Sequence, residues 1–362
     1  MNRLVLIIAL ALLGPRTFAF DVVSSKSQLE QNTIYGMVVD METHEPLPSA
    51  TVYINGTTKG TITNLNGTFE LKDVSLPADV VVSFVGYQIQ SVYLDRSPDN
   101  LLVELKTNDK LPEVVIEDKN ERENIMRYFR RLLLGDDYWA ANATIKNEDV
   151  LMFKTEGSIL HAWANEPLII DLPLLGYELH LSMVRFEAER KDFKNRCNMI
   201  GYFFYMPNMP DKRIKERKII KNRQTAYYNS SQHFLKSLFD NKLEENGYRA
   251  HILETADDEN QSGAVTDFSQ HIIRIDDNQM QIVGLKGKSL LIEYYSKNEL
   301  PMNLMTGDEK PHDMSESSVT FLQDTCTVFQ GGRVVDNSLI FSSDIAKKRV
   351  AACLPADYNP AE

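Results

Sequence analysis

The pattern of apolar and polar positions divides the chain into a β-rich N-terminal part and a larger mixed part. From Ile34 to Leu105, short runs that alternate between apolar and polar residues are separated by Gly, Pro and Asn turns. This spacing is typical of a small antiparallel β-sandwich. The runs predict about seven strands, among them 34–39, 51–54, 68–71, 80–84, 89–94 and 101–105. Asn55-Gly56 predicts a tight hairpin, because these residues supply the positive φ angles that such a turn needs.

The region 119–362 mixes helical and strand patterns. Apolar residues recur at helical spacing over 119–134 and over 223–246, and a glycine follows each run. Strands are expected at 150–155, 158–164, 168–172, 177–187, 199–204, 249–254, 271–275, 281–283, 290–294, 318–323, 328–329 and 334–341. We therefore expect a mainly β protein. A seven-stranded antiparallel β-sandwich precedes a β-rich α+β region that has at least two amphipathic helices.

The N-terminus has the pattern of a secretory signal peptide. Arg3 precedes an apolar core at 4–13, and Thr17 and Ala19 supply small residues at the −3 and −1 positions of a cleavage site. This core is shorter than the roughly 20 residues that span a bilayer. We expect cleavage near Ala19, export, and no transmembrane helix in the remaining chain. The expected parts are a signal peptide at 1–19, a sandwich at 30–105, a linker at 106–118 and a final region at 119–362.

Charge and cysteine content narrow the class of protein further. The formal net charge of −12 argues against nucleic acid as a partner, because phosphate binding needs a positive surface. The three cysteines, Cys197, Cys326 and Cys353, are too few for a disulfide framework, and an odd number leaves at least one thiol unpaired. Cys326 and Cys353 are open to pairing in an oxidising compartment. Their apolar neighbours favour the alternative that they are buried core residues.

Several short motifs in the N-terminal part occur in a fixed order. They are Gly36-x-Val38-x-Asp40, Pro46-Leu47-x-x-Ala50-x-Val52, Gly56-Thr57-x-x-Gly60-Thr61, Asn66-Gly67-x-Phe69 and Ser83-Phe84-x-Gly86-Tyr87. In this order they resemble the carboxypeptidase-regulatory-like domain, a non-catalytic module of exported proteins that also occurs on the N-terminal extensions of TonB-dependent outer-membrane receptors. The resemblance implies a β-sandwich and a place in a bacterial cell envelope. It implies no reaction.

A second resemblance concerns the larger region. Its motifs are Glu166-Pro167-Leu168, Leu175-Gly176-Tyr177, Asn222-Arg223-x-x-Ala226-Tyr227, His233-Phe234-x-x-Ser237-Leu238 and an ending with Arg349 and Leu354-Pro355-x-Asp357-Tyr358. Together they resemble a family of Bacteroidetes proteins that joins the same sandwich to this kind of C-terminal region. This resemblance implies an architecture and carries no activity.

The stretch 211–223 is conspicuously basic in an acidic chain. One interpretation is a peripheral contact, through 212–223, with an anionic membrane surface or an acidic partner. The other is a solvated loop or helix start whose lysines keep the protein soluble, and we favour this second interpretation.

No motif in the chain predicts catalysis or a cofactor. A nucleophile elbow, a P-loop, His-Glu-x-x-His and Cys-x-x-Cys are all missing from the sequence. His251 and Glu254 have the spacing His-x-x-Glu, but on a strand they would point to opposite faces, so we expect neither a zinc site nor a metallocarboxypeptidase. Arg223, His233 and Arg349 are the weak candidates for a binding site. For His233, a hydrogen-bonded structural role is the favoured alternative.

We therefore expect a non-enzymatic, exported binding protein, located in the periplasm or associated with the outer membrane, whose partner is an envelope protein or a glycan. Two alternatives stay open. One is a periplasmic hydrolase with an unrecognised site in the C-terminal region, and the other is an accessory subunit of an outer-membrane transport or adhesion complex.

Overall fold

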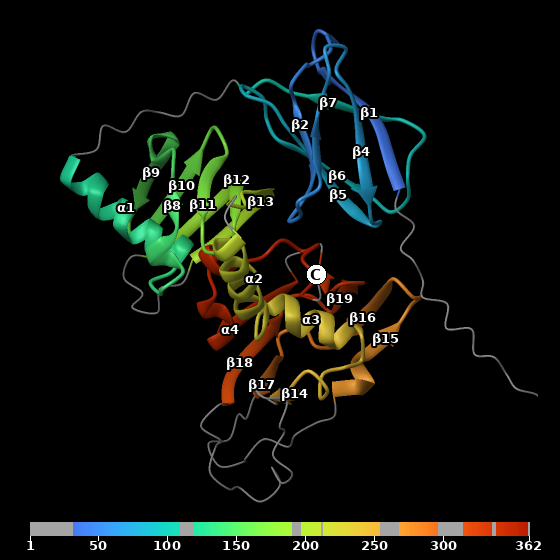
Figure 1. Ribbon diagram of the computed structural model, residues 1–362, viewed down its shortest axis with the longest axis vertical. Helices are drawn as coiled ribbons and strands as arrows, with labels where there is room; N and C mark the ends of the chain where they lie inside the picture. The colour runs from blue at the N-terminus through green and yellow to red at the C-terminus, as the bar shows by residue number, and fades with distance from the viewer. Residues whose placement is uncertain are drawn as a thin grey trace, which may run out of the picture.

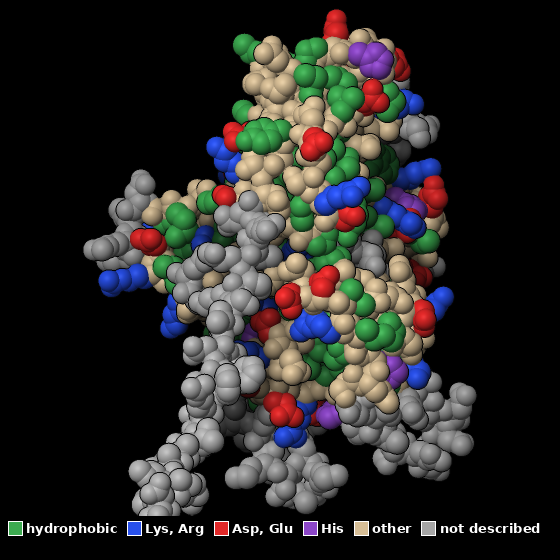
Figure 2. Space-filling view, turned by 90° about the vertical axis from the view of Figure 1, so that its right-hand side faces the viewer, with side chains coloured by type: hydrophobic (Ala, Val, Ile, Leu, Met, Phe, Trp, Pro, Cys, Tyr) green, Lys and Arg blue, Asp and Glu red, His purple; other side chains and the backbone are tan. Residues whose placement is uncertain are grey.

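The computed structural model describes residues 32–108, 119–189, 197–210, 213–253, 268–295, 314–334 and 338–360. The expected signal peptide at 1–19 and the larger part of the linker at 106–118 lie outside these residues. The fold is mainly β, as the sequence predicts, and it forms three regions (Figure 1). Each region has its own hydrophobic core, while hydrophobic, acidic and basic side chains are interspersed on the face of the molecule that Figure 2 shows. Among the described residues, no helix has both the length and the apolar character needed to cross a membrane.

The first region is the expected seven-stranded sandwich. One sheet has the order β4-β1-β7 and the other has the order β3-β2-β5-β6. The strands are β1 (Asn32–Asp40), β2 (Thr51–Ile54), β3 (Gly60–Ile62), β4 (Thr68–Val74), β5 (Ala78–Ser83), β6 (Gln90–Leu94) and β7 (Leu101–Leu105). Alternating apolar side chains from both sheets fill the space between them, and Ile34, Val52 and Val80 are completely buried there.

Two details of the sandwich differ from the prediction. β7 pairs with β1 in parallel rather than antiparallel, with Gly36 opposite Leu101. This happens because the chain leaves the second sheet after β6 and crosses to the first sheet, where it enters beside β1. The Asn55-Gly56 turn is present, since Gly56 has a φ of 75° and the N–H of Thr57 donates to the carbonyl of Ile54 at 3.2 Å, but it does not by itself close a tight hairpin. A longer loop, 55–59, joins β2 to β3, and the N–H of Ile54 donates to the carbonyl of Lys59 at 2.9 Å.

The second region is a six-stranded sheet with one helix packed on it. Its strands are β8 (Thr144–Ile145), β9 (Leu151–Glu156), β10 (Ile159–Ala164), β11 (Leu168–Leu172), β12 (Tyr177–Glu189) and β13 (Cys197–Pro207). The helix is α1 (Lys119–Leu134), as predicted, and its buried Phe129 contacts Phe153 and Phe186 of the sheet at ring distances of 5.5 and 4.8 Å. β12 pairs with β11, β10 and β13. The sandwich packs on the other face of this sheet, where Tyr53 contacts Phe204 of β13.

The single helix predicted over 223–246 was wrong, because the structure has two helices here. The helices are α2 (Arg213–Tyr227) and α3 (Ser231–Phe239). Asn229 between them has a positive φ of 56°, which ends α2. Ser230 then caps α3, because its hydroxyl accepts the N–H of His233 at 3.1 Å. The basic stretch therefore belongs mostly to α2 and is not a loop, although Asp211 and Lys212 lie outside the described residues.

The third region contains two four-stranded sheets, α3 and the short helix α4 (Asp344–Lys347). One sheet has the order β14-β17-β18-β21 and the other has the order β15-β16-β19-β20. The strands are β14 (Tyr248–Leu253), β15 (Ile272–Arg274), β16 (Gln279–Val283), β17 (Ser289–Tyr295), β18 (Met314–Phe321), β19 (Thr325–Phe329), β20 (Arg333–Val334) and β21 (Leu339–Ser343). Phe234 and Leu238 of α3 are buried in the core shared with both sheets.

Candidate binding site between the sandwich and the six-stranded sheet

The loop 55–59, which we call the docking loop, fixes the sandwich to the edge of the six-stranded sheet. The N–H of Gly56 donates to the carbonyl of Phe203 at 2.7 Å, and the N–H of Tyr205 donates to the carbonyl of Thr57 at 3.0 Å. The side-chain oxygen of Asn55 accepts the N–H of Phe203 at 3.0 Å. The loop thus extends the hydrogen-bond ladder of β13 by a short parallel bridge.

The C-terminal segment holds the other side of the docking loop. The N–H of Ala356 donates to the carbonyl of Gly56 at 2.7 Å. The carboxylate of Asp357 accepts the hydroxyl of Thr58 at 2.6 Å and its N–H at 3.1 Å. The C-terminal segment that carries these residues lies under the sandwich (Figure 1). The motif residue Asp357 is thus bonded to the docking loop, about 300 residues away in the sequence.

Two further contacts complete the attachment of the sandwich. The ring of Tyr53, which is only 3% exposed, stacks on Phe204 of β13 with a centroid distance of 4.9 Å. On the third region, the guanidinium of Arg333 donates to the carbonyl of Pro77 at 2.8 Å. Burial lowers the pKa of Arg333, and the nearby carboxylate of Asp79 opposes this shift. The sandwich is therefore bonded to both of the other regions.

Beside this attachment the two facing sheets leave a hollow, which we call the interdomain groove. It has a volume of about 530 Å³. The sandwich wall consists of Ser49, Thr51, Ser83, Phe84, Val85, Tyr87, Gln88, Ile89 and Asn108. The opposite wall consists of Ala164, Asn165, Glu166, Pro167, Ser182, Met183 and Val184. Val85 and Val184, one on each wall, are 71% and 51% exposed. This size is typical of a small-molecule or peptide-segment site.

An irregularity in β12 shapes the second wall. The pairing of β12 with β13 shifts between Met183 and Arg185, so Val184 is an extra residue. Buried positions in β12 are odd up to Met183 and even from Phe186 onward. Such bulges turn a side chain out of the regular alternation. Here the bulge leaves Val184 exposed at the groove.

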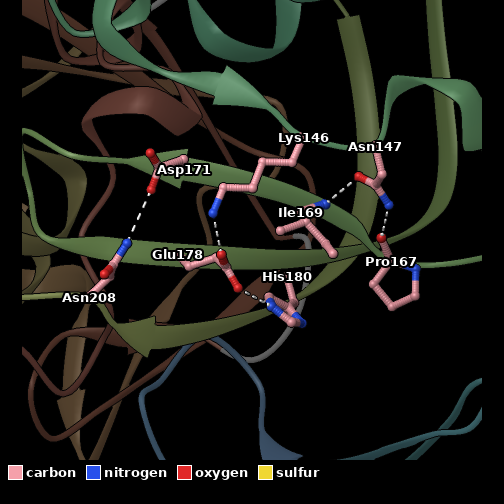
Figure 3. A network of polar contacts seen from close by, with 8 residues as sticks. All are labelled: Lys146, Asn147, Pro167, Ile169, Asp171, Glu178, His180 and Asn208. Atoms are coloured by element: carbon pink, nitrogen blue, oxygen red, sulfur yellow. Dashed lines mark hydrogen bonds and ion pairs between the residues drawn. The ribbon is translucent and has the colours of Figure 1, made fainter.

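A network of polar contacts lies on the same face of the sheet (Figure 3). The ammonium of Lys146 lies 2.6 Å from the carboxylate of Glu178, whose other oxygen lies 2.9 Å from the ring of His180. The hydrogen bond from Lys146, and then that from His180, lower the pKa of Glu178. Asn208 also donates to Asp171 at 3.3 Å. Lys146 thus compensates the charge of Glu178, and His180 is held two residues before Ser182 of the groove.

Asn147 fixes the part of the groove that lies between β10 and β11 (Figure 3). Its amide donates to the carbonyl of Pro167 at 2.9 Å, and its side-chain oxygen accepts the N–H of Ile169 at 2.8 Å. The first bond joins Asn147 to the turn between β10 and β11, which carries Glu166, and the second joins it to the start of β11. The carboxylate of Glu166 is the one charged group in the described groove lining, which is otherwise made of hydroxyl, amide and apolar side chains. Such a lining suits an uncharged or weakly charged ligand that offers hydrogen bonds.

Of the three residues predicted from the sequence, Arg223 lies at the turn between β11 and β12. Its guanidinium donates to the carbonyls of Leu175 at 2.7 Å and Gly176 at 3.3 Å, and it lies 4.1 Å from the ring centre of Tyr177. Gly176 has a positive φ of 65°, and a side chain there would meet Met209. The motif residues Leu175-Gly176-Tyr177 and Arg223 are therefore joined by packing and hydrogen bonds.

His233 lies inside a cluster of tyrosines. It is 4% exposed, and its Nδ1 lies 2.9 Å from the hydroxyl of Tyr248. The rings of Tyr227 and Tyr294 also contact it, at 4.9 and 6.0 Å. Burial, and to a smaller extent the charge of Lys348, lowers the pKa of His233 from 6.5 to about 4. The imidazole is neutral at pH 7, and its surroundings are those of a hydrogen-bonded core residue.

Arg349 occupies a third environment, against the end of α1. Its side chain lies next to Gly135, and its carbonyl accepts the thiol of Cys353 at 3.3 Å. Its neighbour Lys348 reaches back to the end of α2, where its ammonium donates to the carbonyls of Ala226 at 2.9 Å and of Tyr228. Arg223, His233 and Arg349 therefore lie in three different packing environments, and the groove lining contains none of them.

The groove residues themselves were missed from the sequence, as was the role of the docking loop. Serine, threonine and valine on strands give no signal of chemistry. The shift of alternation after Met183 was the one available sign, because a bulge often marks a site. None of the three cysteines forms a disulfide among the described residues, and Cys326 is fully buried, in agreement with its interpretation as a core residue.

The motifs of the sandwich also have a structural explanation. The carboxylate of Asp40 accepts the hydroxyl of Tyr87 at 2.7 Å and the N–H groups of Glu42 and Thr43 at 2.8 Å. The bonds from the Thr43 N–H, the Tyr87 hydroxyl and the Glu42 N–H lower the pKa of Asp40 to about 2. The first and last motifs of the sandwich are thus joined by the hydrogen bond between Tyr87 and Asp40.

Comparison with known proteins agrees with this assignment of the sandwich. The CarboxypepD_reg-like domain family matches residues 34–116. TonB-dependent receptor SusC of Bacteroides thetaiotaomicron is 39% identical over 88 residues, which are 24% of this chain and 8% of the receptor. The N-terminal domain is therefore a carboxypeptidase-regulatory-like domain, and the chain spans 8% of the length of this curated relative.

Similarity to solved structures is slight. A chain of a type II cohesin–X-dockerin complex from Acetivibrio cellulolyticus is 19% identical, with 27% of this chain and 72% of that chain covered and a TM-score of 0.19. A 9R-lipoxygenase from Cyanothece is 10% identical, with 60% of this chain and 48% of that chain covered and a TM-score of 0.16.

Proposed function

We propose that this protein is an exported, non-enzymatic binding protein of the cell envelope, in the periplasm or associated with the outer membrane, and that the interdomain groove holds its partner. The observation that carries the proposal is the groove itself. Its two walls come from separate domains that the docking loop holds together. The hollow of about 530 Å³ lies between walls that are already held in place, so binding a ligand there does not need the free energy of a domain closure.

The chemistry of the lining supports binding rather than turnover. Acid–base catalysis needs titratable groups within hydrogen-bond reach of each other and of the substrate. In the described lining, Glu166 has no second carboxylate, histidine or cysteine beside it. His233, the candidate histidine of the C-terminal region, is neutral and lies within the tyrosine cluster.

The location is supported by two observations. The sequence at 1–19 has the basic, apolar and small-residue parts of a signal peptide. The sandwich is similar to part of a TonB-dependent receptor. An accessory role beside such a receptor would be one form of this function.

Cross-linking in intact host cells, followed by mass spectrometry, tests the proposal. The wild type is compared with Val85→Glu, which places a charge in the groove, and with Leu65→Glu, a matched change at an 88% exposed position of the sandwich outside the groove. We expect Val85→Glu to lose the cross-linked partner and Leu65→Glu to keep it. Equal recovery with both variants would show that the groove is not the binding site. Chemical conversion of the recovered partner by purified protein would contradict the non-enzymatic part.

A further inference from the structure

The first half of α2 carries several exposed basic side chains. Lys215, Arg217, Lys218 and Lys221 are all exposed, whereas Ile219 faces the interior and is 5% exposed. At 1.5 Å and 100° per residue, these four cations span about 9 Å of the helix axis, with Arg217, Lys218 and Lys221 on one side and Lys215 next to Lys218. The exposed Glu216 lies among them, so they leave an excess of positive charge on a chain with a formal charge of −12, and we call them the basic surface of α2.

These cations lack the ion pairs that several other basic groups of the protein form. Arg130, Lys146 and Arg185 each form an ion pair with a glutamate. By contrast, none of the four side chains on α2 forms an ion pair with a residue in the described ranges. Lys218 and Lys221 are three residues apart on the helix, where like charges destabilise it by a few tenths of a kcal/mol. The surface is thus mildly unfavourable in the free protein and would be relieved by an anionic partner.

A hollow of mixed polarity lies beside this basic surface, and Glu216 and Ile220 of α2 form part of its wall. It has a volume of about 390 Å³. Its apolar and aromatic lining comes from Tyr177, Pro207, Met209, Ile220, Pro355 and Tyr358. Ile220 and Met209 are 38% and 37% exposed. The polar and charged part of its lining comes from Thr58, Lys59, Glu216, Arg223, Asp357 and Asn359. Asp357 is bonded to Thr58.

We propose that the basic surface of α2, together with the exposed side chains of Ile220 and Met209 beside it, docks the protein on a membrane surface that contains anionic lipids. The cations bind the phosphate groups, and Ile220 and Met209 contact the hydrocarbon next to them. An acidic protein would pair with the cations but would not account for the exposed Ile220 and Met209 beside them. A lipid surface accounts for both, because it offers phosphate groups and hydrocarbon side by side. This inference goes beyond the groove function, because the groove lining contains no residue of α2.

Vesicle binding by the mature protein tests the inference. The probes are vesicles of phosphatidylcholine alone and vesicles of phosphatidylcholine mixed with phosphatidylglycerol. We expect binding to the mixed vesicles only, and weaker binding as salt is raised. Each basic residue near an anionic surface contributes about fivefold to affinity, so the double variant Lys218→Gln, Lys221→Gln should bind about 25-fold more weakly.

The matched control is Lys72→Gln with Lys242→Gln. It removes the same total charge at two exposed positions that lie away from α2. This variant should bind like the wild type. Ile220→Ser should weaken binding without changing its dependence on salt, because it removes only apolar contact. Melting curves followed by circular dichroism confirm that each variant is folded.

Three results would overturn the proposal. The first is equal binding to neutral and mixed vesicles, and the second is an equal loss of binding in the α2 variant and the matched control. The third is no binding to mixed vesicles together with α2-dependent binding to polyglutamate, which would identify an acidic protein as the partner. None of these results bears on the groove variants at Val85, so failure here leaves the proposed function separately testable.

Discussion

Tyr53 and Phe204 provide the sharpest test of how the sandwich is attached, because they lie in different domains and yet their rings stack at 4.9 Å. Aromatic side chains bury roughly 150 Å² or more, and each Å² is worth about 25 cal/mol. Tyr53→Ala should therefore weaken the attachment by about 3 kcal/mol. Phe204 is only half-buried, so Phe204→Ala should cost about 2 kcal/mol. The pair should show a coupling of about 1 kcal/mol in a double-mutant cycle.

Hydrogen exchange measured by mass spectrometry suits this cycle, because a protein with several cores does not unfold in one step. The observed segment is the docking loop, whose N–H of Gly56 is bonded to β13. Its opening free energy is compared in the wild type, both single variants and the double variant. Leu65→Ala serves as the control, since this side chain is 88% exposed. A coupling within about 0.3 kcal/mol of zero would mean that the two rings do not contact each other, and would refute the docked arrangement.

Three further variants test other parts of the structure. Arg333→Met should lower the opening free energy measured by hydrogen exchange around Pro77 by about 1–3 kcal/mol, because a partly buried carbonyl loses its charged donor. His233 has a pKa of about 4 in the folded protein and 6.5 when unfolded, so its neutral form contributes stability above pH 6.5, and about 3 kcal/mol is lost as the pH falls toward 4. His233→Gln should lower the Tm at pH 7 and flatten the dependence of Tm on pH over this window; an unchanged profile would contradict the assignment. Tyr87→Phe should lower the unfolding free energy of the sandwich by about 1 kcal/mol in urea titrations, since Asp40 loses a hydrogen bond, whereas no change would show that this bond is not formed in solution.

The sequence was sufficient for the parts of the fold that depend on local pattern. α1 and β11 have the predicted bounds, because their apolar positions follow a single period. The break between α2 and α3 was missed because apolar residues continue across it, whereas the break depends on Asn229 and on the hydroxyl of Ser230. A capping residue inside an apolar run gives only a weak signal.

The candidate site could not be predicted from the local sequence pattern, for a different reason. The groove is formed by residues such as Thr51 and Ser182, which are ordinary strand residues until two domains face each other. That arrangement depends on contacts between positions that are about 150 or 300 residues apart, such as Asn55 with Phe203 and Thr58 with Asp357. The motif residues Arg223 and His233 were noticed because they are chemically distinctive, and the structure gives both of them packing partners.

Site-specific photo-cross-linking in intact cells tests the central claim, binding in the interdomain groove, most directly. A photoreactive phenylalanine derivative is placed at Val85 on the sandwich wall, at Val184 on the sheet wall, and at Leu65 as the exposed control. A partner held between the two walls should give the same adduct from Val85 and Val184 and none from Leu65. Adducts of equal yield from all three positions, or different adducts from the two walls, would contradict binding in the groove.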